Sequence, residues 1–191
     1  MKSIHGTITE QNLLKAFAGE SQARNRYHLF AEVAKQEGYE QIMSIFAETA
    51  EQEYAHASRF FRFLDGGMVT ITAEYPAGRI GTTAENLLEA AEGEKLEWSA
   101  LYYDFEQTAI DEGFKDVAAA FKKIAEVESF HEWRYRRMLQ RLEDGSMFMR
   151  QEPITWQCRN CGYIYEGDRP PMMCPACLKT IAYFEPKRNN Y

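Results

Sequence analysis

The chain has 191 residues, of which 45% are hydrophobic and 14% aromatic, enough for a globular protein with a buried core. Its 22 basic and 29 acidic residues give a net charge of −7, and no basic stripe is interleaved with aromatic residues, which argues against nucleic acid as a partner. The first ten residues lack the basic start and apolar run of a secretory signal, and no apolar stretch approaches the roughly 18 residues of a membrane span. We therefore expect a cytoplasmic protein with no nucleic-acid or membrane partner.

Helical periodicity dominates residues 1–150, where apolar residues recur at steps of three and four. Gly38 and Gly113 interrupt this pattern as helix-ending glycines do. We predict four helices, roughly Glu10 to Glu37, Tyr39 to Leu64, Ala84 to Glu112 and Phe114 to Leu142.

The segment Asp65 to Thr83 is rich in Gly and Pro, which predicts a connection and not a helix. Its about nineteen residues, at roughly 3.3 Å each, can run the whole length of a bundle, whereas Gly38 and Gly113 permit only tight hairpins. The predicted fold of residues 1–150 is therefore an all-α four-helix bundle with one long crossover.

The two predicted hairpins repeat each other. Leu13 to Glu20 matches Leu87 to Glu94 at an offset of 74 residues, and after a one-residue slip the later positions match at an offset of 75. Such a repeat indicates two helical hairpins related by an approximate two-fold axis. A site on that axis would be built from two copies of each ligand.

Carboxylate and imidazole side chains occupy repeat-matched positions. Two helices each carry a Glu-x-x-His motif, whose side chains project from one helix face, and the other two helices each add a lone glutamate. The six candidate ligands are Glu20, Glu53, His56, Glu94, Glu128 and His131. This is the ligand set of ferritin-like di-iron carboxylate proteins, in which four carboxylates balance the charge of two ferrous ions. A single Glu-x-x-His is more often a solvated helical pair, so the prediction depends on the repeat.

Three further residues lie near these ligands in the sequence. Glu97 has Ala23 as its counterpart, so it is either a seventh ligand, which would make the two irons inequivalent, or a solvated charge. Tyr27 and Tyr102 correspond at an offset of 75, about two turns beyond the lone glutamates. Each either donates a hydrogen bond to a ligating carboxylate or packs in the core.

All four cysteines lie near the C-terminus, in the pairs Cys158-x-x-Cys161 and Cys174-x-x-Cys177 with twelve residues between them. This spacing predicts a closed tetrahedral metal site and not disulfides, and it is shared by zinc ribbons and iron rubredoxins. An apolar shell of Trp156, Tyr163, Tyr165 and Phe184 is expected around the metal. We predict a second small domain over residues 151–191, stabilised by its metal.

These motifs together resemble the rubrerythrin family over essentially the whole chain. Residues 16–27 (AFAGESQARNRY) are similar to the first-helix signature of that family, and residues 45–50 (IFAETA), which lead to Glu53, are similar to the second. The run CRNCGYIYEG at 158–167 and CPAC at 174–177 resemble rubredoxin. The resemblance favours iron over zinc at the four cysteines.

The resemblance implies a peroxidase that reduces hydrogen peroxide to water in oxidative stress, with electrons from an NADH-dependent reductase or a separate rubredoxin. It implies a homodimer in which the four-cysteine iron of one subunit serves the di-iron site of the other. The implied iron ligands are Glu20, Glu53, Glu94, Glu97, Glu128 and His131. Glu53 and Glu128 would bridge the irons, and His56 would replace Glu97 on one iron in the reduced state. We predict catalytic roles for Glu97, His56, Tyr27 and Tyr102, with the tyrosines and a displaced Glu97 relaying protons.

The chain departs from the rubredoxin pattern at Leu178, because rubredoxins carry Gly directly after the last Cys. A non-glycine residue with positive φ is strained, so we expect a distorted second knuckle and an altered reduction potential. Two other classes remain open at this stage: an iron-storage protein of the ferritin type, which needs no dedicated electron input, and a non-redox zinc protein that uses the ribbon for interactions.

Overall fold

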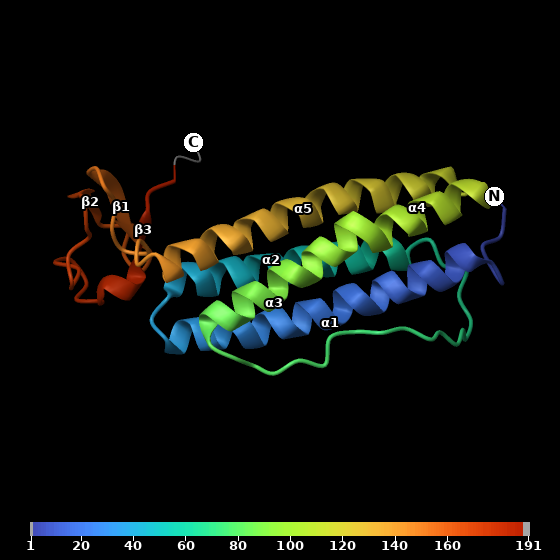
Figure 1. The fold of residues 1–191 in the computed structure, drawn as a ribbon, viewed down its shortest axis with the longest axis horizontal. Helices are drawn as coiled ribbons and strands as arrows, with labels where there is room; N and C mark the ends of the chain where they lie inside the picture. The colour runs from blue at the N-terminus through green and yellow to red at the C-terminus, as the bar shows by residue number, and fades with distance from the viewer. Residues whose placement is uncertain (1, 189–191) are drawn as a thin grey trace.

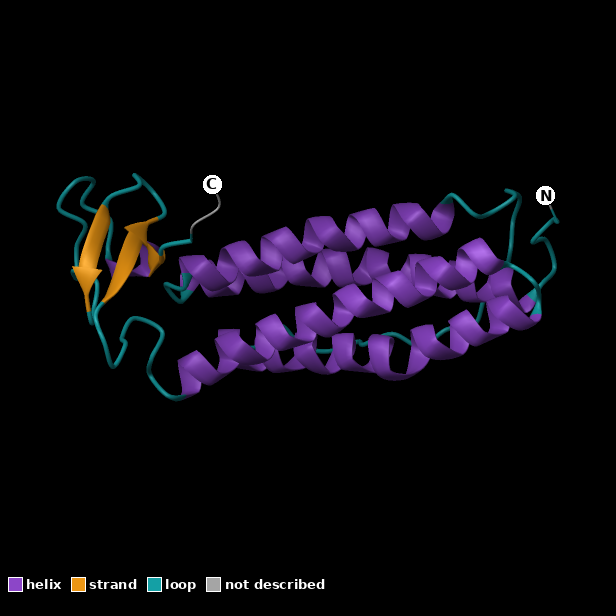
Figure 2. Ribbon diagram, turned by 90° about the horizontal axis from the view of Figure 1, so that it is seen from above, coloured by secondary structure: helices purple, strands orange, loops and turns teal. Residues whose placement is uncertain are grey.

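The computed structural model describes residues 2–188, in which long helices lie side by side and a small β-domain sits at one end of them (Figures 1 and 2). The helices are α1 (Ile8–Gln36), α2 (Glu40–Phe61), α3 (Thr83–Leu96), α4 (Tyr102–Asp111) and α5 (Lys115–Glu143), and a π-helix, η1 (Glu97–Leu101), joins α3 to α4. The predicted four-helix bundle is confirmed, with α3, η1 and α4 forming one of its four rods. Among the described residues, no helix combines the length and the apolar character that crossing a membrane requires.

The π-helix accounts for the one-residue slip in the sequence repeat. Glu20 and Glu94 are 74 residues apart, whereas Tyr27 and Tyr102 are 75 apart, and η1 lies between Glu94 and Tyr102. A π-turn accommodates one extra residue without ending the helix, and such turns occur frequently at functional sites. The third predicted helix is therefore continuous as a rod and irregular in its middle.

The connection between α2 and α3 runs along the bundle beside α1, as predicted for a long crossover (Figure 1). Its start is fixed by Asp65, whose carboxylate accepts hydrogen bonds from the Ser3 hydroxyl and the Ile4 N–H. Its end is fixed by Gly81, whose N–H and C=O both bond the side chain of Asn86. The two hairpins turn within a few residues, at glycines 38 and 113 with φ of +85° and +83°.

Each hairpin caps a helix of the other. The carboxylate of Glu112, after α4, accepts hydrogen bonds from the backbone N–H groups of Ile8 (3.1 Å) and Thr9 (2.8 Å) in the first turn of α1. Its repeat partner Glu37, after α1, accepts from the N–H of Thr83 (3.1 Å) in α3. These carboxylates satisfy N–H groups that have no partner within their own helix, and they join the hairpins at both ends.

Two aromatic clusters lie on either side of an acidic layer in the bundle. The cluster toward the β-domain contains Tyr27, Phe46 and Tyr135, and the one toward the N-terminus contains Phe60 and Phe121. Each fully buried aromatic side chain stabilises the fold by roughly 1.5–3 kcal/mol. This packing offsets the cost of burying the carboxylates between the clusters.

The β-domain is a three-stranded antiparallel sheet in the order β2-β1-β3. Its elements are β1 (Ile154–Cys158), β2 (Ile164–Gly167), the 3-10 helix η2 (Ile181–Tyr183) and β3 (Phe184–Pro186). The helices end at Glu143 and the sheet begins at Ile154, so the predicted boundary at residue 150 falls in the connection between them.

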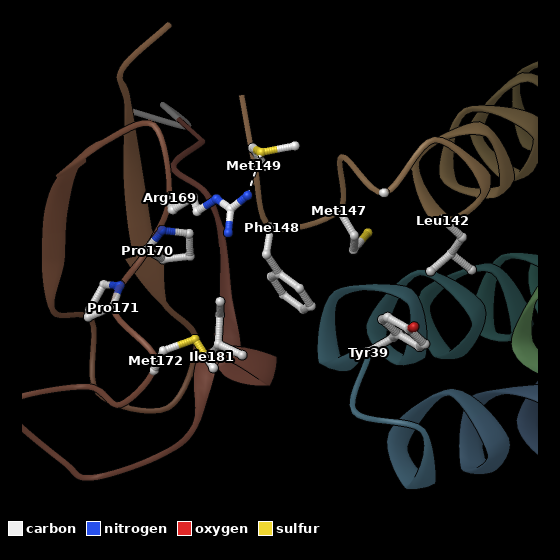
Figure 3. A pocket seen from close by; sticks show the side chains of 11 residues that line it. Tyr39, Leu142, Met147, Phe148, Met149, Arg169, Pro170, Pro171, Met172 and Ile181 are labelled. Carbon is white, nitrogen blue, oxygen red and sulfur yellow. Dashed lines mark hydrogen bonds between the residues drawn. The ribbon is translucent and has the colours of Figure 1, made fainter. Parts of the chain in front are cut away.

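The β-domain packs against the end of the bundle, where η2 and β3 contact α2. A cavity of about 540 Å³ lies at this junction, lined by Tyr39 and Leu142 from the bundle side and by Pro171 and Met172 from the β-domain (Figure 3). The ring of Phe148, in the connection, stacks on that of Tyr39 at 6.3 Å between centroids.

Candidate metal centres

Six potential metal ligands from all four rods meet in the acidic layer. They are Glu20 of α1, Glu53 and His56 of α2, Glu94 of α3, and Glu128 and His131 of α5. The four glutamates and His131 are at most 1% exposed, and the side chain of His56 is 11% exposed. Four carboxylates are not buried together without positive charge to balance them.

The six side chains form two overlapping groups whose ligand atoms lie within 4.8 Å of one another. One group is Glu20, Glu53, His56 and Glu128, and the other is Glu53, Glu94, Glu128 and His131. Glu53 and Glu128, one from each hairpin, belong to both groups. This arrangement suits two metal ions that share two carboxylates, each ion having three carboxylate ligands and one imidazole.

Unpaired atoms at the centre of the groups support this fit. Both carboxylate oxygens of Glu128, one oxygen each of Glu20, Glu53 and Glu94, and Nδ1 of His131 are buried without a hydrogen-bond partner among the described residues. The Nδ1 of His131 is nevertheless only 2.7 Å from Glu128 Oε2, a short contact without the angles of a hydrogen bond. Lone pairs that converge without pairing are what a bound cation would satisfy.

Burial dominates the protonation of the outer carboxylates when no metal is bound. It raises the pKa values of Glu20, Glu94 and Glu97 well above the usual range, and the neighbouring charges of Glu53 and Glu128 raise them further. The raised pKa values favour the protonated forms, and metal ions that bind Glu20 and Glu94 would displace their protons.

Glu53 and the two histidines behave differently from the outer carboxylates. Burial opposes charge on the imidazoles, but the carboxylates of Glu128 and Glu53 raise the pKa of His56 to about 10 and that of His131 to about 9. Burial likewise opposes ionisation of Glu53, yet the two histidines lower its pKa to about 2. Without metal, two protonated histidines thus supply the positive charge between the central carboxylates.

The two buried tyrosines hydrogen-bond ligand carboxylates across the hairpins. Tyr27 of α1 donates to Glu94 Oε1 of α3 at 2.5 Å, and Tyr102 of α4 donates to Glu20 of α1. Burial, followed by the adjacent carboxylate, raises the pKa of each phenol well above its usual value, so both keep their protons. Of the two alternatives left open by the sequence, hydrogen bonding to a carboxylate is the one observed, and each bond joins a tyrosine to the glutamate of the opposite hairpin.

Glu97 belongs to neither ligand group. It is half-buried at the start of η1 and lines a cavity beside the site, near enough to Glu128 and Glu53 for their charges to raise its pKa. His56 completes the first group in its place. The seventh ligand, and its exchange with His56, remain predictions.

Gln52 orients the ligand His131. Its role was not predicted from the sequence. Its Oε1 lies 2.9 Å from Nε2 of His131 and accepts a hydrogen bond from that nitrogen, which leaves Nδ1, beside Glu53 and Glu128, as the atom that would bind a metal. The repeat counterpart of Gln52 is Val127, so the internal repeat gave no signal for it.

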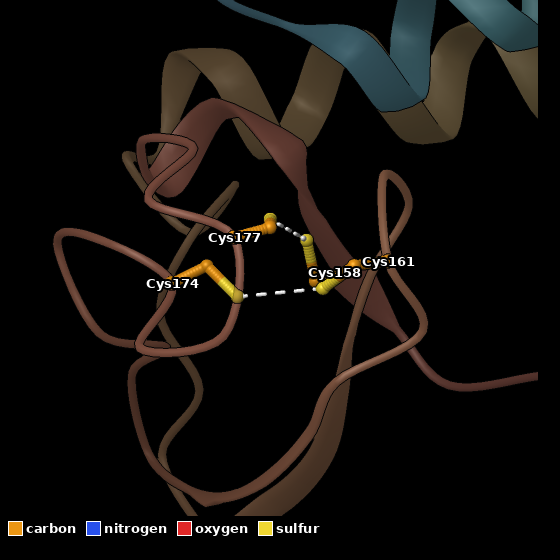
Figure 4. Close-up of side chains that lie close together, drawn as sticks. All are labelled: Cys158, Cys161, Cys174 and Cys177. Carbon is orange, nitrogen blue, oxygen red and sulfur yellow. Dashed lines mark hydrogen bonds between the residues drawn. The ribbon is translucent and has the colours of Figure 1, made fainter.

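The four cysteines come together as predicted (Figure 4). Cys158 and Cys177 have their sulfur atoms 3.7 Å apart, and those of Cys161 and Cys174 are 3.6 Å apart. No disulfide joins any of the four. Four sulfurs at about 2.3 Å from one tetrahedral ion would be about 3.8 Å from each other, so this geometry fits a single metal.

Leu178 has a φ of +59°, which confirms the positive φ expected after the last cysteine, a conformation in which a non-glycine residue is strained. The expected distortion of the second knuckle is wrong. Leu178 donates its N–H to Cys174 O at 2.9 Å, as Gly162 in the first knuckle donates to Cys158 O at 2.8 Å. The backbone keeps the turn and concentrates the strain in one residue.

The predicted aromatic shell is present only in part. Trp156 and Phe184 are fully buried with Cys158 and Cys174 in one cluster, and Tyr163 packs against it. The prediction is wrong for Tyr165, which is 37% exposed and lies outside the cluster.

Comparison with known proteins agrees with both centres. The rubrerythrin family model matches residues 11–139, and the model of the rubrerythrin rubredoxin-like domain matches residues 156–185. Rubrerythrin of Porphyromonas gingivalis is 60% identical over 190 residues, covering 100% of this chain and 95% of that protein. Rubrerythrin of Nitratidesulfovibrio vulgaris is 48% identical over 185 residues, covering 97% of each.

Solved structures show the same architecture. A mixed-valence state of nigerythrin matches with a TM-score of 0.64 at 28% identity, covering 97% of this chain and 89% of that one. Symerythrin from Cyanophora paradoxa, also with a TM-score of 0.64, is 22% identical, covers 75% of this chain and 89% of its own, and shows the fold alone. The residues present fit a di-iron site in the bundle and a rubredoxin-type iron at the four cysteines. The chain belongs to the rubrerythrin family.

Proposed function

We propose that this oxidoreductase reduces hydrogen peroxide to water at its di-iron site. The observation that carries the proposal is that one chain contains both a rubredoxin-like domain and two buried ligand groups. These two groups have Glu53 and Glu128 in common. Iron storage needs no built-in electron carrier, so the second domain favours a redox enzyme.

Reduction of peroxide consumes two electrons and two protons and gives two water molecules. When bound in the reduced state, the paired irons would supply the electrons that break the oxygen–oxygen bond. The protein supplies and positions protons. Tyr27 and Tyr102 hold theirs against Glu94 and Glu20, and Glu97 lies between the ligand groups and an adjacent cavity, where it can carry protons inward.

We also propose that His56 and Glu97 alternate as the fourth ligand beside Glu20, Glu53 and Glu128. The support is that His56 belongs to this set and Glu97 does not, the arrangement that the family resemblance assigns to the reduced state. His131 is held by Gln52 and stays in place. Ferric iron, the harder ion, favours a carboxylate, and ferrous iron accepts an imidazole.

We further propose a cytoplasmic homodimer supplied with electrons by a rubredoxin or an NADH-dependent reductase. Within one chain the four-cysteine domain lies beyond one end of the bundle (Figure 1), whereas Glu20 and Glu128 stand near the middle of α1 and α5. The stretch of α5 from His131 to Glu143 alone spans about 18 Å at 1.5 Å per residue. A second subunit in the opposite orientation, shifted by about half the bundle length, would bring its cysteine domain beside the middle of this bundle.

Steady-state assays test the proposal. Iron-loaded protein, supplied with NADH, a reductase and rubredoxin, is expected to consume peroxide. Glu97→Ala, which installs the residue found at the counterpart position, is expected to lose turnover while keeping its iron, because six ligands remain. Glu32→Ala, an exposed change on α1, serves as the control. Absence of peroxide consumption by the wild type contradicts the proposal, and full activity of Glu97→Ala removes Glu97 from the mechanism.

A further inference from the structure

A cavity of about 460 Å³ lies between α1 and the rod of α3, η1 and α4. Its inner wall includes Glu97 and Tyr102, and residues 72–76 of the crossover form its outer wall. Because Tyr102 donates a hydrogen bond to Glu20, one side of this cavity is a single contact away from the first ligand group. The crossover thus covers the space that leads to the candidate di-iron site.

Two glycines keep the helical walls of the cavity open. Gly19 and Gly93 are repeat partners, each directly before a ligand glutamate, and both line the cavity. Glycine within a helix is unfavourable relative to alanine, so these positions need a reason. A Cβ at Gly19 would lie 3.6 Å from the ring of Tyr75, and one at Gly93 would lie 3.7 Å from the guanidinium of Arg26. A longer side chain at either position would enter the cavity.

Tyr75 attaches the outer wall, residues 72–76, to α1. Its ring lies over Gly19, and its hydroxyl donates a hydrogen bond to the carbonyl of Lys15 at 2.8 Å. Within residues 66–80, all of them described, this is the one hydrogen bond. Tyr75 is 38% exposed. A segment held by so few contacts opens at low free-energy cost.

The lining of the cavity is mostly apolar, with the charged side chains of Arg26 and Glu97 among it. Arg26 pairs with Glu89 through one nitrogen, but its Nε is buried without a hydrogen-bond partner among the described residues. The other terminal nitrogen of the guanidinium, Nη2, lies beside Gly93 in the cavity lining, and its N–H groups can donate to an oxygen or to a small anion. With Glu97 opposite, the lining offers both a donor and an acceptor.

We propose that this cavity is the route by which small polar molecules reach the di-iron site from solvent, and that Tyr75 is the residue that gates it. The identity of the natural solute as peroxide rests on the function proposed above, whereas the route itself does not. Gating of this kind slows association without changing the chemistry inside.

Stopped-flow binding of azide to the iron-loaded protein tests the route without turnover. Tyr75→Ala removes the ring and the hydrogen bond, and azide is expected to associate about tenfold faster; Gly19→Leu fills the cavity and is expected to slow it about tenfold. Tyr103→Ala, an exposed aromatic change one residue beyond Tyr102, is the matched control and keeps the wild-type rate.

Iron content is measured first, because Leu at position 19 adjoins a ligand. If Gly19→Leu does not load iron, Tyr75→Phe replaces it in the test: this variant keeps the ring, so its rate is expected to fall between those of the wild type and Tyr75→Ala. Wild-type azide rates in the loaded cavity variants overturn the route. Altered azide rates in a protein with no preference for peroxide would keep the route and refute the proposed function; peroxide preference with unaltered azide rates would do the reverse.

Discussion

Tyr27 and Tyr102 each fix a ligand carboxylate of the opposite hairpin, so the hydroxyl groups connect the two halves at the metal site. Replacing either tyrosine with Phe removes one donor and leaves the ring. We expect iron affinity to fall by about tenfold or more, as is typical when a partner of a metal ligand is lost. Competition with an iron chelator measures this change.

Tyr135→Phe is the matched control for these variants. Tyr135 is also fully buried, but its hydroxyl donates no hydrogen bond to a ligand carboxylate among the described residues. Its repeat counterpart is Phe60, so the chain already carries the substituted residue at the equivalent position. Iron affinity that falls equally in all three variants would show that the hydroxyls act through packing and not through the carboxylates.

Leu178 is a second residue whose effect can be isolated. Leu178→Gly is expected to raise the free energy of unfolding of the metal-loaded β-domain by about 1 kcal/mol or less, because relief of the left-handed strain is partly offset by a more flexible unfolded chain. Leu178→Ala keeps the Cβ and should give no such gain. Guanidinium unfolding followed by the absorbance of the thiolate centre measures both; equal stability of the Gly and Ala variants would refute the strain.

The metal ligands could be predicted from the sequence because they are repeated, and residues outside the repeat could not. Glu20, Glu53 and their partners stand at matching positions, so each supports the other. Gln52 has a valine as its counterpart, and its role became evident only when its amide was placed beside His131. Tyr165 was misplaced because composition does not say which side of a strand faces the metal.

The π-helix η1 could be predicted from the sequence only in part. The slip from an offset of 74 to one of 75 located an extra residue between Glu94 and Tyr102. The sequence of this stretch did not show whether the residue would end the helix or be absorbed as a π-turn, since local propensity hardly distinguishes them and packing on α1 and α5 decides. The crossover was predicted from its glycines and prolines. The cavity that it covers could not be predicted, because the cavity depends on the path of the crossover over the helices.

The cross-hairpin caps make a prediction about helix ends. Partial burial tends to raise the pKa of Glu112, but the hydrogen bonds from Thr9 and Ile8 lower it below the usual value. Because the pKa of Glu112 is lower in the folded than in the unfolded chain, the ionised cap stabilises the fold at pH values above the pKa of the unfolded chain. This contribution is lost as the pH falls through the pKa of the folded chain. Glu112→Gln is therefore expected to reduce the free energy of unfolding by about 1 kcal/mol at neutral pH, with the difference shrinking in acid.

Asp111→Asn provides the control, because it removes the same charge from the adjacent, exposed residue, which does not cap α1. Chemical denaturation of both variants across the acid range measures the effect. If Asp111→Asn destabilises as much as Glu112→Gln, net charge and not the cap is responsible.

For the whole molecule, the two domains differ in what holds them together. The bundle has two large aromatic clusters, whereas the fully buried core of the β-domain is Trp156 and Phe184 with two metal-binding cysteines. Removing the metals is expected to unfold residues 154–186 and leave the helices folded. Hydrogen exchange of the metal-free protein should show lost protection in the sheet and retained protection in α1 and α5; a sheet that stays protected would contradict this.

The proposed enzyme combines a rubredoxin-like electron carrier with a di-iron peroxidase site in one chain. The most direct test is anaerobic: the protein is reduced fully, one equivalent of hydrogen peroxide is added, and the visible absorbance of the ferric thiolate centre is followed beside an oxygen control. The account predicts rapid return of colour with peroxide and slow return with oxygen. A protein that is colourless throughout, as zinc would make it, or that recolours no faster with peroxide than with oxygen, would contradict it.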